Sequence, residues 1–156
     1  TGAEVHLHDA SSARLEMAKS GFGFEHVHLA GEPLISGDLA DGFDVVFDAT
    51  GNAKAIEAGF AHVAHGGTYV LVSVVKDDIR FTDSEFHKRE MRLIGSRNAL
   101  AQDFRHVMDA LGDGRIDSNR LVSTIFPLED LPQLMPELAH DREGLIKAIV
   151  AIGALD

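Results

Sequence analysis

Polar side chains stand directly after several apolar segments, where a nucleotide could bind. Asp9 follows the short alternating segment Glu4-Val5-His6-Leu7-His8. A carboxylate at the end of a strand can accept hydrogen bonds from both ribose hydroxyls of an adenosine while repelling a 2′-phosphate. The same carboxylate can instead cap a following helix, because the helix dipole favours an anion at its N-terminus. Both interpretations stay open for Asp9.

Three further segments follow apolar runs. Asp48-Ala49-Thr50-Gly51-Asn52 has small side chains that would let a ribose or a flat ring approach the backbone at Thr50 and Gly51. Val72-Ser73-Val74 offers an uncharged wall to such a ring. Ser96-Arg97-Asn98 is the one polar cluster with a cation at such a place, and Arg97 suits a phosphate, an amide, an acidic substrate or a structural salt bridge. Turns, helix caps and strand packing explain the same residues equally well.

The nine histidines raise the question of a metal site. The pairs are His6 with His8, His26 with His28, and His62 with His65; the first two would each share a strand face and the third a helix face. No pair has two further ligands at a recognisable spacing. Polar faces account for the pairs, so we expect no metal bound by these residues.

Other catalytic patterns do not occur. The sequence has no G-x-S-x-G nucleophile elbow and no phosphate loop ending in Gly-Lys-Ser or Gly-Lys-Thr. Tyr69 is the single tyrosine, and Ser73 stands where a short-chain dehydrogenase has its catalytic lysine. We therefore expect no catalytic residue in this chain.

Composition narrows the class of protein. The 156 residues carry 25 acidic and 14 basic side chains, a net charge of -11, which disfavours nucleic acid and anionic membranes as partners. The absence of cysteine excludes disulfides, thiolate nucleophiles and cysteine-ligated zinc within these residues. The apolar segments are too short to span a bilayer. We expect a soluble, cytoplasmic domain.

The elements that would position these residues alternate along the chain. Strands are predicted over residues 4–8, 25–29, 43–48, 68–75 and 91–95, with helices from Ser11 to Lys19, from Asn52 to a Gly66-Gly67 ending, after the capping-box segment 82–85, and around residues 104–111. Continuous apolar strands are typical of parallel sheets buried on both faces. The pattern predicts a doubly wound parallel α/β sheet, whose ligands bind beyond the carboxyl ends of the strands.

The pattern changes after Gly114. A strand over residues 121–126, a helix over 127–139 interrupted by Pro132 and Pro136, and a strand over 146–152 are predicted to leave the main sheet. We expect residues 1–114 to form part of a dinucleotide-binding domain, and residues 115–156 to form a C-terminal segment that packs toward a catalytic domain.

The order and spacing of these motifs resemble the zinc-dependent medium-chain alcohol dehydrogenases, in particular the branch that acts on polyols, sugar acids and threonine. The resemblance rests on residues 4–9, 14–19, 43–52, 66–72, 96–99, 124–128 and 147–150. It implies a Rossmann-type cofactor domain that binds NAD, and transfer of a hydride between NAD and a secondary alcohol polarised by zinc. It also implies a homo-oligomer with a small-molecule alcohol as substrate.

The resemblance also implies roles for individual residues. Asp9 would hold the adenosine ribose, and Arg14 would lie near the adenosine edge. Thr50 and Gly51 would lie along the dinucleotide. Two segments would flank the nicotinamide, namely Val72-Ser73-Val74 and Ser96-Arg97. Asp9 favours NAD over NADP, although Ser11, Ser12 and Arg14 soften that preference.

The sequence departs from the family in one large respect. It contains no G-x-G-x-x-G turn: Gly21-Phe22-Gly23 begins the motif, but His26 stands at the position of the third glycine. The family's first strand and its zinc ligands precede the region matched here. We therefore expect the chain to be the C-terminal part of a larger enzyme and to be inactive alone. In the strand order 3-2-1-4-5-6 the missing strand is central, so its loss should separate the first two predicted strands from the other strands. A methyltransferase using S-adenosylmethionine and a non-catalytic nucleotide-binding module are the alternatives.

Overall fold

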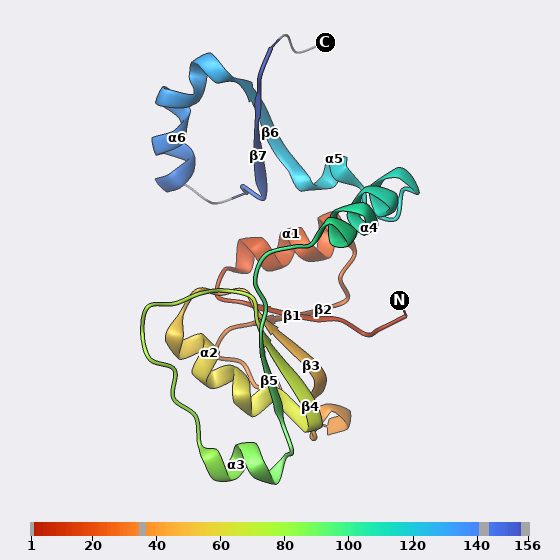
Figure 1. Ribbon diagram of the computed structural model, residues 1–156, viewed down its shortest axis with the longest axis vertical. Coiled ribbons are helices and arrows are strands. Elements are labelled where there is room, and N and C mark those ends of the chain that lie inside the picture. Colours follow the sequence, from red (N-terminus) through yellow and green to blue (C-terminus); the bar gives the residue numbers. More distant parts are fainter. Residues whose placement is uncertain (1, 35–36, 141–143, 154–156) are drawn as a thin grey trace. The chain divides into compact units, whose positions relative to one another are not determined.

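The computed structural model describes residues 2–34, 37–140 and 144–153 and divides into two compact units. One unit comprises Thr1–Glu32 with Ala101–Asp156, and the other comprises Pro33–Leu100 (Figure 1). The first contains β1 (His6–Asp9), α1 (Ser12–Phe22), β2 (His26–Leu29), α4 (Ala101–Gly112), α5 (Ser118–Leu121), β6 (Val122–Pro127), the 3-10 helix η3 (Leu128–Asp130), α6 (Leu131–His140) and β7 (Lys147–Ala151). The second contains η1 (Gly37–Leu39), β3 (Phe43–Asp48), α2 (Ala53–Gly59), η2 (Phe60–His62), β4 (Val63–Leu71), α3 (Asp83–Lys88) and β5 (Arg92–Gly95).

All strand pairs in the described residues are parallel, and they form three separate sheets of order β1-β2, β3-β4-β5 and β6-β7. The alternation of parallel strands with helices confirms the α/β prediction. The predicted split is also confirmed, because β1 and β2 pair with each other and not with β3. As expected for the last part of the chain, β6 and β7 pair apart from the other strands.

The core of the second unit lies between α2 and the sheet. Ile56, Phe60, Val63, Tyr69 and Met91 form its buried cluster. The Tyr69 hydroxyl donates to the Ile56 carbonyl at 3.0 Å, and the Phe60 ring meets the Tyr69 ring edge-on at 4.9 Å. Gly59 must lack a side chain, because a Cβ there would lie 2.1 Å from the Tyr69 hydroxyl oxygen.

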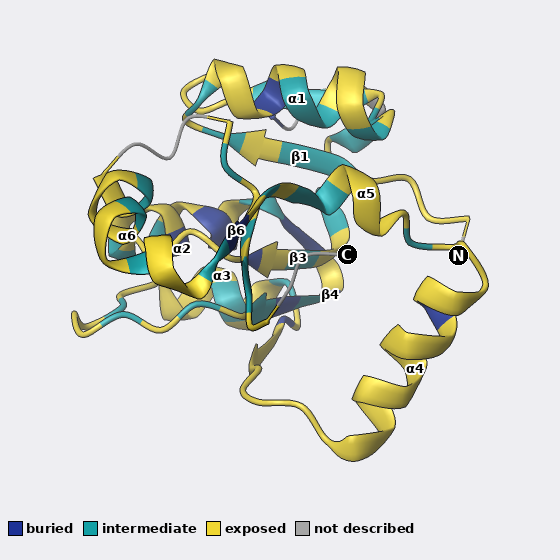
Figure 2. Ribbon diagram, turned by 90° about the horizontal axis from the view of Figure 1, so that it is seen from above, coloured by how far each residue is buried: buried dark blue, intermediate teal, exposed yellow. Residues whose placement is uncertain are grey.

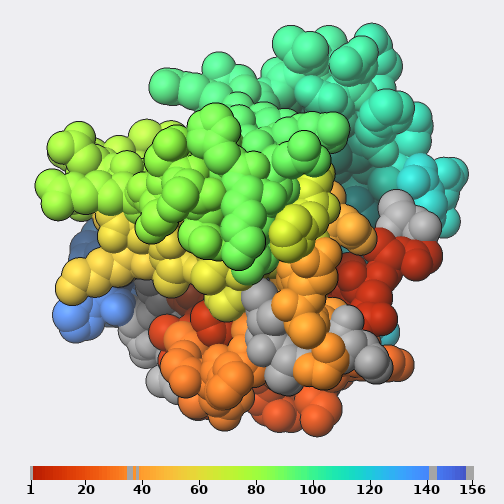
Figure 3. Space-filling view, turned by 90° about the horizontal axis from the view of Figure 1, so that it is seen from below, coloured from red at the N-terminus to blue at the C-terminus, as the bar shows by residue number. Residues whose placement is uncertain are grey.

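The segment after β4 closes this core from the side of α2. The Phe81 ring stacks on Phe60 at 4.8 Å and contacts Phe86 of α3 at 5.2 Å. Figure 3 shows this segment in green lying over the yellow segment that contains α2. Aromatic packing therefore holds the long connection between β4 and β5 in place.

The prediction that β3 is buried on both faces is wrong for the described structure. Val46 packs against the core, whereas Val45 and Phe47 point to the other face and are 49% and 67% exposed. The physical reason is that α2 packs against one face of the sheet and leaves the Val45 and Phe47 side exposed. Figure 2 shows the resulting mixture of buried and exposed positions along the strand.

The predicted boundary between α2 and β4 is also wrong. α2 ends at Gly59 and β4 begins at Val63, so His62 and His65 do not share a helix face. Gly66 and Gly67 lie inside β4, where the pairing with β3 shifts between Phe43 and Val45. Gly66 has φ 72°, and a Cβ on Gly67 would lie 2.9 Å from the Ala64 carbonyl oxygen. The glycines serve a strand irregularity and do not end a helix.

The first unit begins with a strand, helix and strand in sequence. α1 runs past the predicted stop at Gly21 and ends at Gly23, whose φ of 77° allows the left-handed helix ending. Arg120 of α5 donates to the Gly21 carbonyl at 3.1 Å.

Helix α4 is mostly exposed, as Figure 2 shows, and Phe104 and Met108 are among its exposed residues. None of the helices in the described residues has the length and apolarity needed to cross a membrane.

Candidate cofactor site

The carboxyl ends of β3, β4 and β5 are aligned by the register of the sheet. Asp48 pairs with Leu71, and Leu71 pairs with Gly95, so the three strands end side by side. The segments that follow them leave from one edge of the sheet: Thr50 and Gly51, Val72 to Val74, and Ser96 with Arg97. The structure thus brings together seven of the nine residues that the sequence assigns to a cofactor site.

Asp48 joins two of these segments and is 4% exposed. Its Oδ1 accepts from the Thr50 backbone N–H at 3.3 Å and from the Thr50 hydroxyl at 2.7 Å. Its Oδ2 accepts from the Ser73 hydroxyl. The Asp48 carbonyl also accepts from the backbone N–H groups of Val72 and Ser73, at 2.9 and 3.2 Å. Asp48 therefore fixes the two loops in relation to each other.

This network changes the roles of Thr50 and Ser73. Both hydroxyls donate to the Asp48 carboxylate, so they are not available to a ligand. Thr50 and Ser73 would therefore contact a ligand through their backbone atoms. The sequence analysis left Asp48 out of the site. The available signal was a carboxylate directly after the apolar run Val45-Val46-Phe47, because a carboxylate next to buried positions is rarely without partners.

Gly51 and Asn52 form the turn into α2. Gly51 has φ 65°, and a Cβ added there would meet no atom within 4 Å. The Asn52 side chain caps α2 by accepting from the N–H groups of Lys54 and Ala55, at 3.0 and 3.2 Å. An open groove here is lined by Gly51, Asn52, Lys54 and Asp77, among other residues. The edge is therefore accessible at the position where the sequence expects the dinucleotide.

The other residues at this edge are exposed. Val72 and Val74 are 48% and 76% exposed, which suits an apolar wall that a flat ring would cover. Arg97 is exposed, and within the described part of the chain it makes no ion pair. The alternative role of Arg97 in a structural salt bridge is therefore not realised among these residues. Asn98 turns the chain with φ 63°, a conformation that asparagine tolerates.

Asp9 and Arg14 lie in the other unit, at the carboxyl end of β1. Asp9 Oδ1 accepts from the Ser11 backbone N–H at 2.8 Å, while Ser11 itself caps α1 by accepting from the Arg14 N–H at 3.3 Å. Asp9 Oδ2 lies 3.9 Å from Arg14 Nη1, and the two side chains are 37% and 50% exposed. Ser11 therefore caps the helix, and the Asp9 side chain remains partly exposed to solvent.

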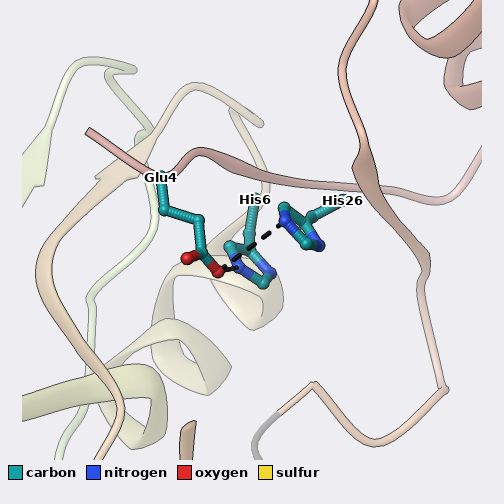
Figure 4. A group of neighbouring side chains, drawn as sticks. All are labelled: Glu4, His6 and His26. Carbon is teal, nitrogen blue, oxygen red and sulfur yellow. Dashed lines mark hydrogen bonds and ion pairs between the residues drawn. The ribbon is translucent and has the colours of Figure 1, made fainter. Parts of the chain in front are cut away.

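A group of imidazoles lies on the β1-β2 sheet, near the start of both strands (Figure 4). Glu4 accepts from His6 Nε2 at 2.7 Å, and His26 Nε2 lies 3.7 Å from the same carboxylate oxygen. The His6 hydrogen bond and then the His26 charge hold the pKa of Glu4 below its ordinary value. Burial, and then the charges of the neighbouring histidines, lower the pKa of His28.

The residues present suit parts of NAD. In one unit, the partly exposed Asp9 carboxylate can accept hydrogen bonds from an adenosine ribose, and in the other, the apolar wall at Val72 and Val74 suits a nicotinamide ring. The glycine-rich turn that binds the pyrophosphate in Rossmann folds does not occur in this sequence. The chain has no cysteine to bind zinc. The zinc of a dehydrogenase of this kind would have to be held by residues outside this chain.

Comparisons with known proteins agree with this geometry. Residues 1–113 match the family model described as zinc-binding dehydrogenase. The chain is 31% identical to L-galactonate-5-dehydrogenase from Escherichia coli K12, over 96% of this chain and 45% of that protein. It therefore spans less than half the length of this relative.

Two solved structures share the fold. An alcohol dehydrogenase from Escherichia coli CFT073, complexed with NADH, superimposes with a TM-score of 0.83 at 18% identity, covering 95% of this chain and 44% of the other. A zinc-binding dehydrogenase from Sinorhizobium meliloti bound to NADP gives a TM-score of 0.81 at 22% identity, covering 95% and 45%. The family match, the identity to a curated relative and the shared fold lead to one conclusion: this chain belongs to the zinc-binding dehydrogenase family.

Proposed function

We propose that the protein carrying this chain is an NAD-dependent, zinc-assisted dehydrogenase of a secondary alcohol, with a polyol, a sugar acid or a threonine-like compound as substrate. The observation that carries the proposal is the aligned carboxyl edge of β3, β4 and β5, with an open turn at Gly51 and an apolar wall at Val72 and Val74. The family match favours this function over a methyltransferase.

In this proposal the chain binds and orients the cofactor. Asp9 accepts hydrogen bonds from the adenosine ribose, and Arg14 lies beside the adenosine. Thr50 and Gly51 present backbone to the dinucleotide, and Val72, Ser73 and Val74 form one wall of the nicotinamide site. Ser96 and Arg97 form its other side. Zinc, held by residues outside the chain, would act as the Lewis acid that lowers the pKa of the bound alcohol.

The proposed division of labour follows the sequence pattern. Residues 1–114 supply part of the dinucleotide-binding domain, and residues 115–156 pack toward the catalytic domain. The separate β6-β7 sheet supports this division. We also propose a cytoplasmic homo-oligomer. Size-exclusion chromatography with light scattering on the full-length protein tests the oligomer, and a monomer would contradict it.

The Asp9 carboxylate provides the test of cofactor binding. Asp9→Asn in the full-length protein removes a charge-assisted acceptor, and such a hydrogen bond contributes about 1.5–3 kcal/mol, so NAD affinity should fall by about ten- to a hundredfold. NADP affinity should fall less, because the charge that repels its 2′-phosphate is also removed.

The matched control is Asp113→Asn, which alters an exposed aspartate paired with Arg115 at 3.2 Å. Isothermal titration measures the affinities of the wild type and of the two variants for NAD and for NADP. Equal NAD affinity in the wild type, Asp9→Asn and Asp113→Asn would remove Asp9 from the site. The substrate class is tested by assaying NAD reduction with a panel of polyols, sugar acids and threonine.

A further inference from the structure

Three metal-binding side chains meet at the start of the β1-β2 sheet. Glu4, His6 and His26 each offer one ligand atom that lies within 4.8 Å of the other two. Figure 4 shows the carboxylate of Glu4 directed at the His6 ring, with the His26 ring stacked beside it. The His6 and His26 rings are 4.4 Å apart and tilted by 9°. The carboxylate is 65% exposed and the His26 side chain 42%, so an ion can reach the group from solvent.

The strand register explains why sequence spacing did not indicate this group. His6 pairs with His26 across the two parallel strands, and His8 pairs with His28. Side chains two residues apart share a strand face, so the pairing sets all four imidazoles on one face of the sheet. The group therefore takes one histidine from each His-x-His pair, together with Glu4, and not both histidines of one pair.

The distances between ligand atoms suit one metal ion. Zinc bonds of about 2.0–2.2 Å in a tetrahedral arrangement place the ligand atoms roughly 3.3 Å apart. The Glu4 oxygen lies 2.7 Å from His6 Nε2 and 3.7 Å from His26 Nε2, on either side of that value. A ring nitrogen binds a metal in the plane of its ring, so the stacked His6 and His26 rings must turn for both nitrogens to face one ion. Two imidazoles with one carboxylate then leave a fourth position for water.

His28 supports the arrangement from behind. His6 Nδ1 lies 2.9 Å from His28 Nε2, and the two rings are stacked 5.1 Å apart. A histidine that binds a metal through one ring nitrogen usually donates its other N–H to a fixed acceptor, which sets the tautomer and the ring orientation. Metal binding at His6 Nε2 would replace its hydrogen bond to Glu4 and leave the ring proton on Nδ1, from which His28 Nε2 is placed to accept.

We propose that Glu4, His6 and His26 bind one divalent transition-metal ion of the zinc or nickel type, with His28 orienting His6. Imidazole nitrogens and a carboxylate select such ions over magnesium and calcium. The ion joins the amino ends of β1 and β2, whereas Asp9 lies at the carboxyl end of β1. Within this sheet, the proposed metal site and Asp9 therefore lie at opposite ends of β1.

The test counts nickel ions bound to the full-length protein after dialysis against a weak chelator. Isothermal titration with Ni²⁺ alone is expected to show one more site per chain in the wild type than in His26→Gln. Glu4→Gln alters an exposed side chain that the fold does not need, and it should weaken this site at least about tenfold, as should His28→Gln. The control His87→Gln changes an exposed histidine of α3 and should bind as the wild type does.

Two results would overturn the proposal. The first is an equal number of Ni²⁺ sites in the wild type and in His26→Gln. The second is a loss of binding in His87→Gln as large as that in Glu4→Gln. Circular dichroism of each variant separates loss of the ligand from loss of the fold, and Glu4→Gln keeps the test decisive if His26→Gln unfolds. NAD affinity should be unchanged in Glu4→Gln, so failure of the metal site leaves the cofactor proposal standing.

Discussion

Replacing Asp48 by alanine should lower the free energy of unfolding by about 3 kcal/mol, because this carboxylate ties the ends of β3 and β4 together. It accepts three hydrogen bonds, from the Thr50 N–H, the Thr50 hydroxyl and the Ser73 hydroxyl. A hydrogen bond to a charged group is worth about 1.5–3 kcal/mol. Thr50 is exposed, so in the variant its N–H and hydroxyl can form hydrogen bonds to water, which offset most of the lost stability. Ser73 is partly buried and recovers less.

Asp48→Asn should cost less than alanine, about 1–2 kcal/mol, since the amide oxygen still accepts from Thr50. The matched control is Asp44→Ala, an exposed aspartate on the same strand, and its effect should stay within about 0.5 kcal/mol. Urea unfolding of the full-length proteins provides the free energies, and titration with NAD provides the affinities.

NAD affinity should fall in Asp48→Ala together with stability, because the Thr50 and Ser73 loops lose their common anchor. A stability loss equal to that of Asp44→Ala would refute the anchoring role of Asp48. Full stability loss with unchanged NAD affinity would show that the carboxyl edge of this sheet does not bind the cofactor.

Three further perturbations test the fold around this edge by urea unfolding. Asn52→Ala should cost about 1 kcal/mol through loss of the α2 cap, and Asn52→Ser should restore most of it. Gly59→Ala should cost about 3 kcal/mol, because its Cβ would displace the Tyr69 hydroxyl from the Ile56 carbonyl; a neutral effect would contradict the packing. Burial, and secondarily the Asp48 charge, raise the pKa of Tyr69 from 10.0 to about 12. The stability that this shift contributes is therefore present below pH 10 and is lost as the pH rises toward 12, a dependence that Tyr69→Phe should lack.

Sequence patterns predicted the elements well where local signals agreed. The strand predicted over residues 43–48 has the same bounds as β3 in the structure, Phe43–Asp48. The residue pattern could not place the end of α2, because Phe60 and Val63 continue the helical spacing while they fill the core from a 3-10 turn and a strand. The Gly66-Gly67 pair is an equally good signal for a helix ending and for a strand irregularity, and tertiary pairing decides between them.

The location of the candidate site at one edge of the sheet was predictable from the sequence, whereas the hydrogen bonds within it were not. Parallel strands place the residues after β3, β4 and β5 together, which pattern alone indicates. The hydrogen bond from Ser73 to Asp48 depends on strand register, as does the meeting of His6 with His26. Register follows from the packing of whole strands and has no signature in any one segment. The Thr82 segment begins α3 as its capping-box spacing predicts, but the Thr82 side chain makes no cap hydrogen bond.

Isothermal titration of the full-length protein with NAD and with S-adenosylmethionine tests the central claim most directly. The dehydrogenase account predicts that NAD binds at one site per chain and that S-adenosylmethionine does not bind. Binding of S-adenosylmethionine without binding of NAD would contradict the proposed function.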